Sequence, residues 1–173
     1  MDIQKIVRQI ISTIQHHQIQ DFMQHISSKP IVYSDLFDQF RHPNSGAVVM
    51  FSGEVRNHNK GRKVTHLEYE AYAPMAEKMI EEILAAAISK WKLNQAACIH
   101  RTGKVEISES AVVVITGAAH RLAAYEANRY IIDKVKNEVP IWKHEFFADG
   151  SSEWGQNCDC STPPYHRYEK TEC

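Results

Sequence analysis

Residues 73–91 read APMAEKMIEEILAAAISKW, which is the clearest helical pattern in the chain. Its apolar side chains recur every three or four residues, which is the spacing of one face of an α-helix. They are Met75, Met79, Ile83, Ala87 and Trp91, flanked by Ile80, Leu84 and Ile88. The pattern predicts a long amphipathic helix whose methionine-lined side packs against the core.

Two strands are expected before this helix. Residues 46–57, GAVVMFSGEVRN, contain a continuous apolar run that is typical of a buried strand. Residues 64–72, VTHLEYEAY, alternate between apolar and polar side chains, as a half-exposed strand does. Because the turn-rich segment HNKGRK joins them, we expect these two strands to form a hairpin.

After the helix, strands are expected at residues 96–101 and 111–119, followed by a second long helix over residues 121–138. The inner stripe of that helix is Ala124, Ala127, Ile131 and Val135. Pro140 ends it, a strand follows at residues 140–147, and a short strand lies around Trp154. Hairpin strands separated by two long helices predict an α+β fold with a mixed or antiparallel sheet.

The N-terminal region has its own pattern. Isoleucines recur at helical spacing between Ile3 and Ile26, which predicts an amphipathic N-terminal helix. The residues SSKP at 27–30 break it, and a short second helix is expected from Ser34, a good N-cap residue.

Composition limits the possible functions. The 173 residues suit a single domain, and 43% of them are hydrophobic. Lys plus Arg (20) nearly balances Asp plus Glu (21), so the net charge of −1 offers no general attraction to nucleic acid or membrane. The apolar run AVVVI is far too short to cross a bilayer, and the N-terminus lacks the features of a signal peptide. We therefore expect a cytoplasmic protein.

The four cysteines fall into two groups. Cys98 lies in an expected strand, where a small buried thiol fits. Cys158, Cys160 and Cys173 lie near the C-terminus with His166, which makes a zinc site conceivable. Their spacing matches no standard finger, however, so a polar tail with reduced thiols and no metal is the preferred interpretation.

Several cationic residues border the expected strands. Arg56 directly follows an apolar strand, whereas Lys60, Arg62 and Lys63 are expected at a solvated hairpin tip. His120 and Arg121 precede the second long helix, whose first N–H groups favour an anion.

Lys136 and Lys143 lie on either side of Pro140, at the border of apolar residues. Either lysine alone can extend harmlessly along apolar surface. Together with Arg56, His120 and Arg121 they would form a cationic pocket for a phosphorylated small molecule or a carboxylate tail. Phosphate-binding glycine loops, G-x-S-x-G and H-E-x-x-H are absent from the sequence.

Four blocks in this order resemble one known family: GAVVMFSGEVRNHNKG, IHRTGKV, AAHRLAAYEANRYIIDKVK and VPIWKHE. They are similar to the large, catalytic subunit of molybdopterin synthase, the MoaE family. The resemblance covers residues 29–157 and leaves a helical extension (1–28) and a cysteine-containing tail (158–173) outside the family core. One departure is Glu54, where the family often has a basic residue.

The resemblance implies a sulfurtransferase with an α/β-hammerhead-like fold and no cofactor. Sulfur would pass from the thiocarboxylated C-terminal glycine of a small ubiquitin-like subunit to cyclic pyranopterin monophosphate (precursor Z), forming the molybdopterin dithiolene. The large subunit would be a homodimer within a heterotetramer. Lys136 and Lys143 would be catalytic, and the residues expected to bind substrate are Glu54, Val55, Arg56, His120, Arg121, Lys136, Lys143, His144 and Glu145.

Physical chemistry allows these roles and leaves alternatives open. Arg56, His120 and Arg121 suit a cyclic phosphate, while the lysines would stabilise the thiocarboxylate and a developing oxyanion. A lysine with a lowered pKa would also serve in proton transfer or as a nucleophile. The main alternative is a non-catalytic paralogue that only binds the small subunit. A metal hydrolase built from His58, His66, His100, His120 and His144 ranks lower, because they lack metal-ligand spacing.

Overall fold

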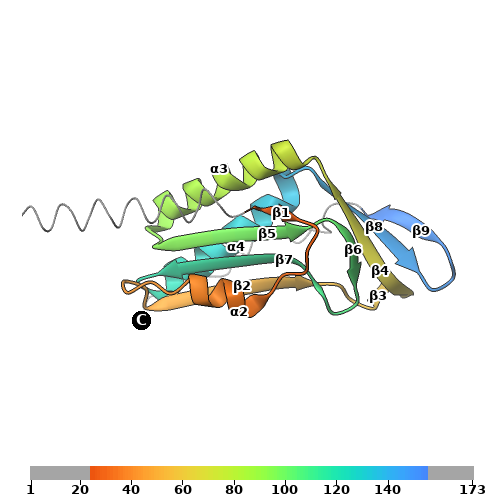
Figure 1. Cartoon of the computed structure of the whole chain (residues 1–173), viewed down its shortest axis with the longest axis horizontal. Coiled ribbons are helices and arrows are strands. Elements are labelled where there is room, and N and C mark those ends of the chain that lie inside the picture. The colour runs from red at the N-terminus through yellow and green to blue at the C-terminus, as the bar shows by residue number, and fades with distance from the viewer. Residues whose placement is uncertain (1–23, 156–173) are drawn as a thin grey trace, which may run out of the picture.

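The computed structural model describes residues 24–155, which form an α+β fold of three helices and two sheets (Figure 1). The first sheet has the strand order β1-β5-β7-β2. Its strands are β1 (Ile26–Ser27), β5 (Gln95–Arg101), β7 (Ser110–Ala118) and β2 (Ala47–Glu54). The sheet is mixed, because β1 runs parallel to β5 while the other neighbours are antiparallel.

The second sheet is antiparallel and lies at one end of the first (Figure 1). Its strand order is β3-β4-β8-β9, and β6 also pairs with β4. The strands are β3 (His58–Asn59), β4 (Arg62–Ala71), β6 (Gly103–Glu106), β8 (Ile141–Phe147) and β9 (Ser152–Gly155).

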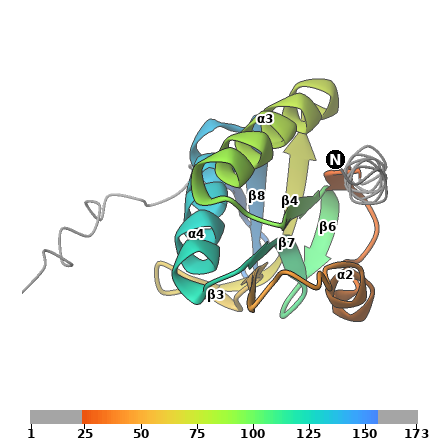
Figure 2. The same cartoon turned by 90° about the vertical axis from the view of Figure 1, so that its left-hand side faces the viewer.

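The long helices α3 (Ala73–Trp91) and α4 (Arg121–Glu138) pack beside each other on one face of the first sheet (Figure 2). The short helix α2 (Tyr33–Gln39) is followed by Phe40, which packs with Ala97 and Ile115 on the other face. Val112 and Val114, which alternate with Ile115 along β7, join the main core under the long helices. The first sheet is therefore covered on both faces.

The expected second long helix is confirmed with the bounds and inner stripe read from the sequence. Its residues Ala124, Ala127, Ile131 and Val135 are all buried. The Val139 N–H donates to the Val135 carbonyl, and Pro140 then begins the connection to β8.

The first long helix is also confirmed, but its buried side differs from the expected one. The buried residues are Ala76, Ile80, Ile83, Leu84 and Ala87, whereas Met75 is half-exposed. A stripe spaced strictly by four residues drifts around a helix of 3.6 residues per turn. The buried side instead alternates steps of three and four, so the expectation that the methionines face the core was wrong for Met75.

The hairpin expected between residues 46–57 and 64–72 does not form. β2 pairs with β7, while β4 pairs with β3, β6 and β8. Only the small β3–β4 hairpin survives, and its turn residues Lys60 and Gly61 have positive φ angles of 48° and 77°. β2 instead pairs with the long, wholly buried β7 and forms one edge of the first sheet. Its apolar residues are half-buried, so the expectation of a buried strand was wrong.

Two expectations near the N-terminus are corrected. The expected N-terminal helix does not include Ile26, because Ile26 is buried in β1 beside His100 of β5. α2 begins at Tyr33 with Val32 at the N-cap position, and its N-cap has no side-chain hydrogen bond, so Ser34 is not the cap. The rest of the expected N-terminal helix and the cysteine tail lie outside the described residues.

Cys98 is fully buried in β5, as expected, and burial raises the pKa of its thiol to about 12. Within residues 24–155, no helix is long and apolar enough to cross a membrane.

Candidate active site

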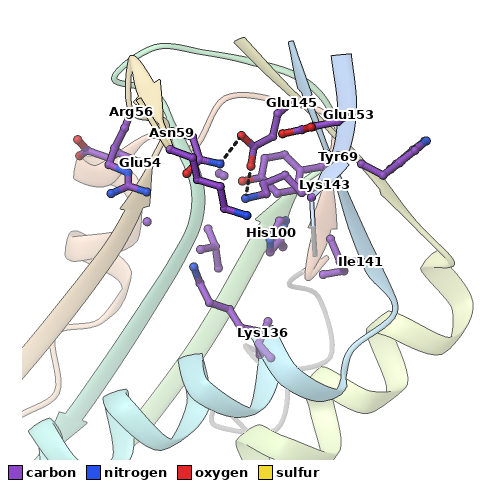
Figure 3. Close-up of a pocket in the computed structure, with 17 residues that line it drawn as sticks. Glu54, Arg56, Asn59, Tyr69, His100, Lys136, Ile141, Lys143, Glu145 and Glu153 are labelled. Atoms are coloured by element: carbon purple, nitrogen blue, oxygen red, sulfur yellow. Dashed lines mark hydrogen bonds and ion pairs between the residues drawn. The ribbon is translucent and has the colours of Figure 1, made fainter. Parts of the chain in front are cut away.

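A cavity of about 530 Å³ opens where the C-terminal end of α4 meets the second sheet (Figure 3). Both sheets and α4 contribute to its walls. The polar side chains that line it are Glu54, Arg56, Asn59, Lys60, Tyr69, His100, Lys136, Lys143, Glu145 and Glu153. Four glutamate or histidine acceptors thus share the cavity with four cationic side chains.

An ion pair on β8 forms one wall. Lys143 Nζ lies 2.6 Å from Glu145 Oε1, and the Glu145 side chain is only 4% exposed. The two residues share a face because side chains two positions apart on a strand point the same way. Asn59 Nδ2 donates to the other carboxylate oxygen at 2.7 Å. Both oxygens of the buried carboxylate therefore have a partner, as Figure 3 shows.

The charge state of Glu145 follows from these partners. Burial acts to raise its pKa, but the hydrogen bonds from Lys143 and Asn59 outweigh burial, and the charges of Lys143 and Lys60 add to them. The pKa of Glu145 is therefore held below its ordinary value. At neutral pH the group is a carboxylate that fixes the Lys143 ammonium in place.

Gly155 on β9 gives Lys143 the space that this position needs. The two residues are register partners. A Cβ atom added at Gly155 would lie 2.4 Å from Lys143 Cε and 3.2 Å from its Nζ. Any larger residue at position 155 would therefore have to displace the lysine chain.

Lys136 approaches the cavity from the opposite side. It lies in the last turn of α4, next to the buried Val135, and points into the cavity (Figure 3). A cation at a helix C-terminus is favoured by the exposed carbonyl groups there. Among the described residues Lys136 makes no ion pair, so its ammonium is available to a ligand.

Arg56 and Glu54 lie at the end of β2, on the rim of the cavity. Both side chains are exposed. The Tyr33 hydroxyl donates to Glu54 Oε1 at 3.4 Å, so the first residues of α2 help to position this rim. Arg56 provides a planar donor suited to phosphate or carboxylate.

The prediction that Lys60, Arg62 and Lys63 lie at a solvated hairpin tip is only partly correct. Lys60 lines the cavity because the tight β3–β4 turn directs it back over Glu145. Arg62 lies 3.5 Å from the centre of the Phe147 ring and forms an ion pair with Glu153. Lys60 and Lys63 are both exposed, as expected, so the correction concerns the cavity position of Lys60 and the partly buried Arg62.

The structure does not bring every expected site residue to this cavity. His120 and Arg121 are exposed at the other end of α4, and 15 residues at 1.5 Å per residue put Arg121 about 22 Å from Lys136. Val55 is buried in the second core cluster, where its backbone hydrogen-bonds Glu109 and Ser108. His144 points to the outer face of the second sheet and stacks on Trp154 at 4.4 Å.

Sequence reasoning missed four polar cavity residues: Asn59, Tyr69, His100 and Glu153. Tyr69 and His100 lie on strands that pair with distant segments, and Asn59 reaches the cavity only because β8 brings Glu145 to it, so no local pattern marks them. Period-two alternation along VTHLEYEAY did place Tyr69 on the same side as the buried Leu67, which was the available signal.

The five histidines considered as metal ligands remain dispersed. Within residues 24–155, no three His, Cys, Asp or Glu side chains are placed to hold a metal ion. His66 and His144 instead belong to a row of stacked rings on the outer sheet face, each within 4.6 Å of Phe146.

A cavity lined by four cationic side chains, one of them fixed by a buried carboxylate, suits an anionic ligand and can stabilise negative charge that develops during group transfer. The comparisons specify the family. The profile "MoaE protein" matches residues 26–138. A molybdopterin synthase catalytic subunit from Thermoplasma volcanium is 44% identical over 75% of this chain and 94% of its own length.

The chain is also similar to solved structures. Molybdopterin synthase from Staphylococcus aureus superposes with a TM-score of 0.72 at 40% identity, covering 76% of this chain and 96% of that one. The Helicobacter pylori complex of subunits 1 and 2 of molybdopterin-converting factor shares the fold, with a TM-score of 0.64 at 20% identity over 76% and 88% of the two chains. The chain belongs to the MoaE family, the catalytic subunits of molybdopterin synthase, which are sulfurtransferases of molybdenum cofactor biosynthesis.

Proposed function

We propose that this chain takes sulfur from the thiocarboxylated C-terminus of a small ubiquitin-like subunit and inserts it into precursor Z to form the molybdopterin dithiolene. The observation that carries the proposal is Lys143, fixed by the buried Glu145 and facing a cavity that Lys136 enters from the opposite side. A thiocarboxylate and a cyclic phosphate are both anions, and this cavity offers them two cations, of which Lys143 is fixed by an ion pair.

Lys143 and Lys136 are the catalytic residues of this proposal. Once the carrier sulfur has bonded to a substrate carbon, water adds to the thioester carbonyl carbon and negative charge develops on its oxygen, which a preorganised ammonium stabilises. When this oxyanion collapses, the C–S bond to the carrier breaks, which leaves the sulfur on the substrate and a carboxylate on the carrier. Glu145 acts as a positioning residue for Lys143, because its two oxygens are already occupied by Lys143 and Asn59. Arg56 and Glu54 on the rim bind polar groups of the substrate.

Four of the residues expected to bind substrate do not line the cavity. Val55 positions its neighbours Glu54 and Arg56 through its buried side chain, and His144 supports the strand that carries Lys143 and Glu145. His120 and Arg121 lie too far from their own cavity, so we propose that they serve the cavity of a second copy in a homodimer. Two such chains with two small subunits make the heterotetramer.

The finer assignments of domains and location belong to the same proposal. Residues 29–157 form the catalytic domain with a hammerhead-like arrangement, which β1 (Ile26–Ser27) joins by pairing with β5. The residues before β1 are an N-terminal extension, and residues 158–173 are a tail. The reaction takes place in the cytoplasm and needs no cofactor.

One reconstitution tests the function. The pure protein is mixed with a thiocarboxylated small subunit and precursor Z, without added metal, and the dithiolene is measured. Production of dithiolene supports the proposal. Failure with a small subunit that is active on another MoaE protein would favour the non-catalytic paralogue.

A further inference from the structure

The floor of the cavity contains an imidazole to which the proposed sulfur transfer gives no role. His100 lies near the end of β5, is only 6% exposed and lines the cavity. Its ring is in edge contact with Tyr69, with the ring centres 5.0 Å apart and an interplanar angle of 68°. The backbone of β5 and this ring contact fix the direction in which the imidazole points.

The hydrogen bonding of His100 determines its tautomer. Nδ1 lies 2.8 Å from the carbonyl oxygen of Arg101. Because a carbonyl only accepts, Nδ1 must carry the hydrogen. Burial lowers the pKa of His100 to about 4, with the Arg101 carbonyl acting against burial and the Lys136 charge adding to it. At neutral pH the ring is therefore uncharged, and Nε2 presents a lone pair.

Nε2 is open to the cavity. Among residues 24–155, the buried side-chain polar atoms without a partner are Gln95 Oε1 and Arg101 Nε. His100 Nε2 is not one of them, although the hydrogen bond of this side chain is made by Nδ1. An unpartnered atom sealed in the core would belong to that set, so we infer that this lone pair faces the cavity that His100 lines.

The buried carboxylate of the cavity is already engaged, because Lys143 and Asn59 occupy both Glu145 oxygens. Lys60, Lys136 and Lys143 are donors only, whereas the Tyr69 hydroxyl can donate as well as accept. The neutral His100 Nε2 carries no hydrogen and can only accept. His100 Nε2 is thus an acceptor in a cavity that several cations line.

We propose that His100 Nε2 accepts a hydrogen bond from an N–H or O–H group of the substrate and so fixes which way round the substrate lies. The ligand that fits has an anionic group at one end, against the cations, and a heterocyclic N–H or a hydroxyl at the other. The inference rests on the proposed function for the identity of that ligand, precursor Z. His100 is then a specificity-determining residue of the cavity.

Three variants of the full chain test this role. His100→Phe keeps an aromatic ring against Tyr69 but removes the acceptor, whereas His100→Gln restores an acceptor oxygen. The matched control is His25→Phe. His25 is 4% exposed, its Nδ1 lies 2.8 Å from the Cys98 carbonyl, and it does not line the cavity. Affinity for precursor Z is measured by calorimetry, and KM and kcat in the reconstituted synthase.

His100→Phe should weaken binding and raise KM by about ten- to a hundredfold, because a donor of the bound substrate then lacks a partner. His100→Gln should recover part of this loss, and His25→Phe should match the wild type. An unchanged affinity in a folded His100→Phe would overturn the inference. So would an equal loss in all three variants, which would indicate packing alone.

A spectroscopic measurement on the wild-type protein avoids any folding defect. With 15N-labelled histidine, the resonance of the unprotonated Nε2 should move when precursor Z binds, and inorganic phosphate alone should leave it in place. If the Nε2 resonance does not move although precursor Z is bound, the proposed role of His100 is wrong. If the wild type binds no precursor Z at all, the proposed function itself fails.

Discussion

The two cavity lysines are held in different ways. Lys143 lies on a strand, paired with a buried carboxylate that Asn59 also holds. Lys136 lies in the last turn of a helix, exposed and without an ion pair among the described residues. The difference indicates that the two ammonium groups are held differently. Lys143 is a fixed cation, positioned before the substrate arrives, and Lys136 is an adjustable cation whose side chain can change position when the substrate binds.

The largest expected effect is at the fixed lysine. Lys143→Ala should lower kcat by about 10²- to 10³-fold, the usual cost of losing one preorganised transition-state contact. Lys143→Arg should be almost as inactive, because the larger planar head does not fit beside Gly155 and cannot supply a deprotonated amine. Turnover is measured in the reconstituted synthase.

A matched control exists on β6. Lys104 and Glu106 form the same lysine-x-glutamate pair at 2.7 Å, but both side chains are about half-exposed. Lys104→Ala should leave turnover and stability nearly unchanged, since exposed ion pairs contribute little. Near-wild-type turnover in Lys143→Ala would remove this residue from the mechanism.

The second effect is on stability in acid. His100 has a native pKa of about 4 against an ordinary value of 6.5. Between these two pH values the unfolded chain therefore binds a proton at His100 that the native protein does not bind. The free energy of unfolding should therefore fall by up to about 3 kcal/mol between roughly pH 7 and pH 4. The lowered pKa of Glu145 acts in the same direction at the acid end of this range.

Urea unfolding at a series of pH values measures this loss, and His100→Phe should flatten the upper part of the curve. Lys136→Met should raise the native pKa of His100, because the Lys136 charge helps to lower it. A pH dependence identical in the wild type and His100→Phe would show that other groups carry the effect.

A smaller effect is expected at the adjustable lysine. Lys136→Ala should reduce turnover by about tenfold, less than at Lys143, because an exposed and unpaired cation is less preorganised. Lys136→Arg should restore most of the activity, since the last turn of α4 leaves room and the charge is kept. If Lys136→Arg is as inactive as Lys136→Ala, this amine has a proton-transfer role and the contrast with Lys143 is lost.

The smallest effect is at the support of the fixed lysine. Gly155→Ala should lower kcat severalfold, because the new Cβ forces Lys143 Cε to move away from its present position. The melting temperature should change little, since the displaced atoms belong to the end of a flexible chain. Unaltered kcat would show that Lys143 works equally well from another position.

Much of the local structure was predictable. The period of 3.6 in residues 121–138 predicted the inner stripe of α4, and Pro140 predicted its end. A strand was expected at residues 140–147, and β8 (Ile141–Phe147) confirms it. The resemblance added the catalytic set, of which Glu54, Arg56, Lys136, Lys143 and Glu145 line one cavity.

Strand pairing was not predictable from these local patterns. The expected hairpin of residues 46–57 and 64–72 failed because β2 and β4 each found a better partner far along the chain. The β4–β8 pairing brings Glu145 to Asn59 of the adjacent β3 and leaves His144 on the outer sheet face, and the β5–β7 pairing positions His100.

By itself, the sequence determined which segments are helices and strands, where α4 ends, and which side chains share a face, because these properties depend on neighbours a few residues away. Only the tertiary structure decided that Glu145 is buried beside Lys143, that Lys60 turns back over it, and that Arg121 lies about 22 Å from Lys136. Burial and enclosure depend on layers built from distant parts of the chain. A cavity exists only after those layers have packed.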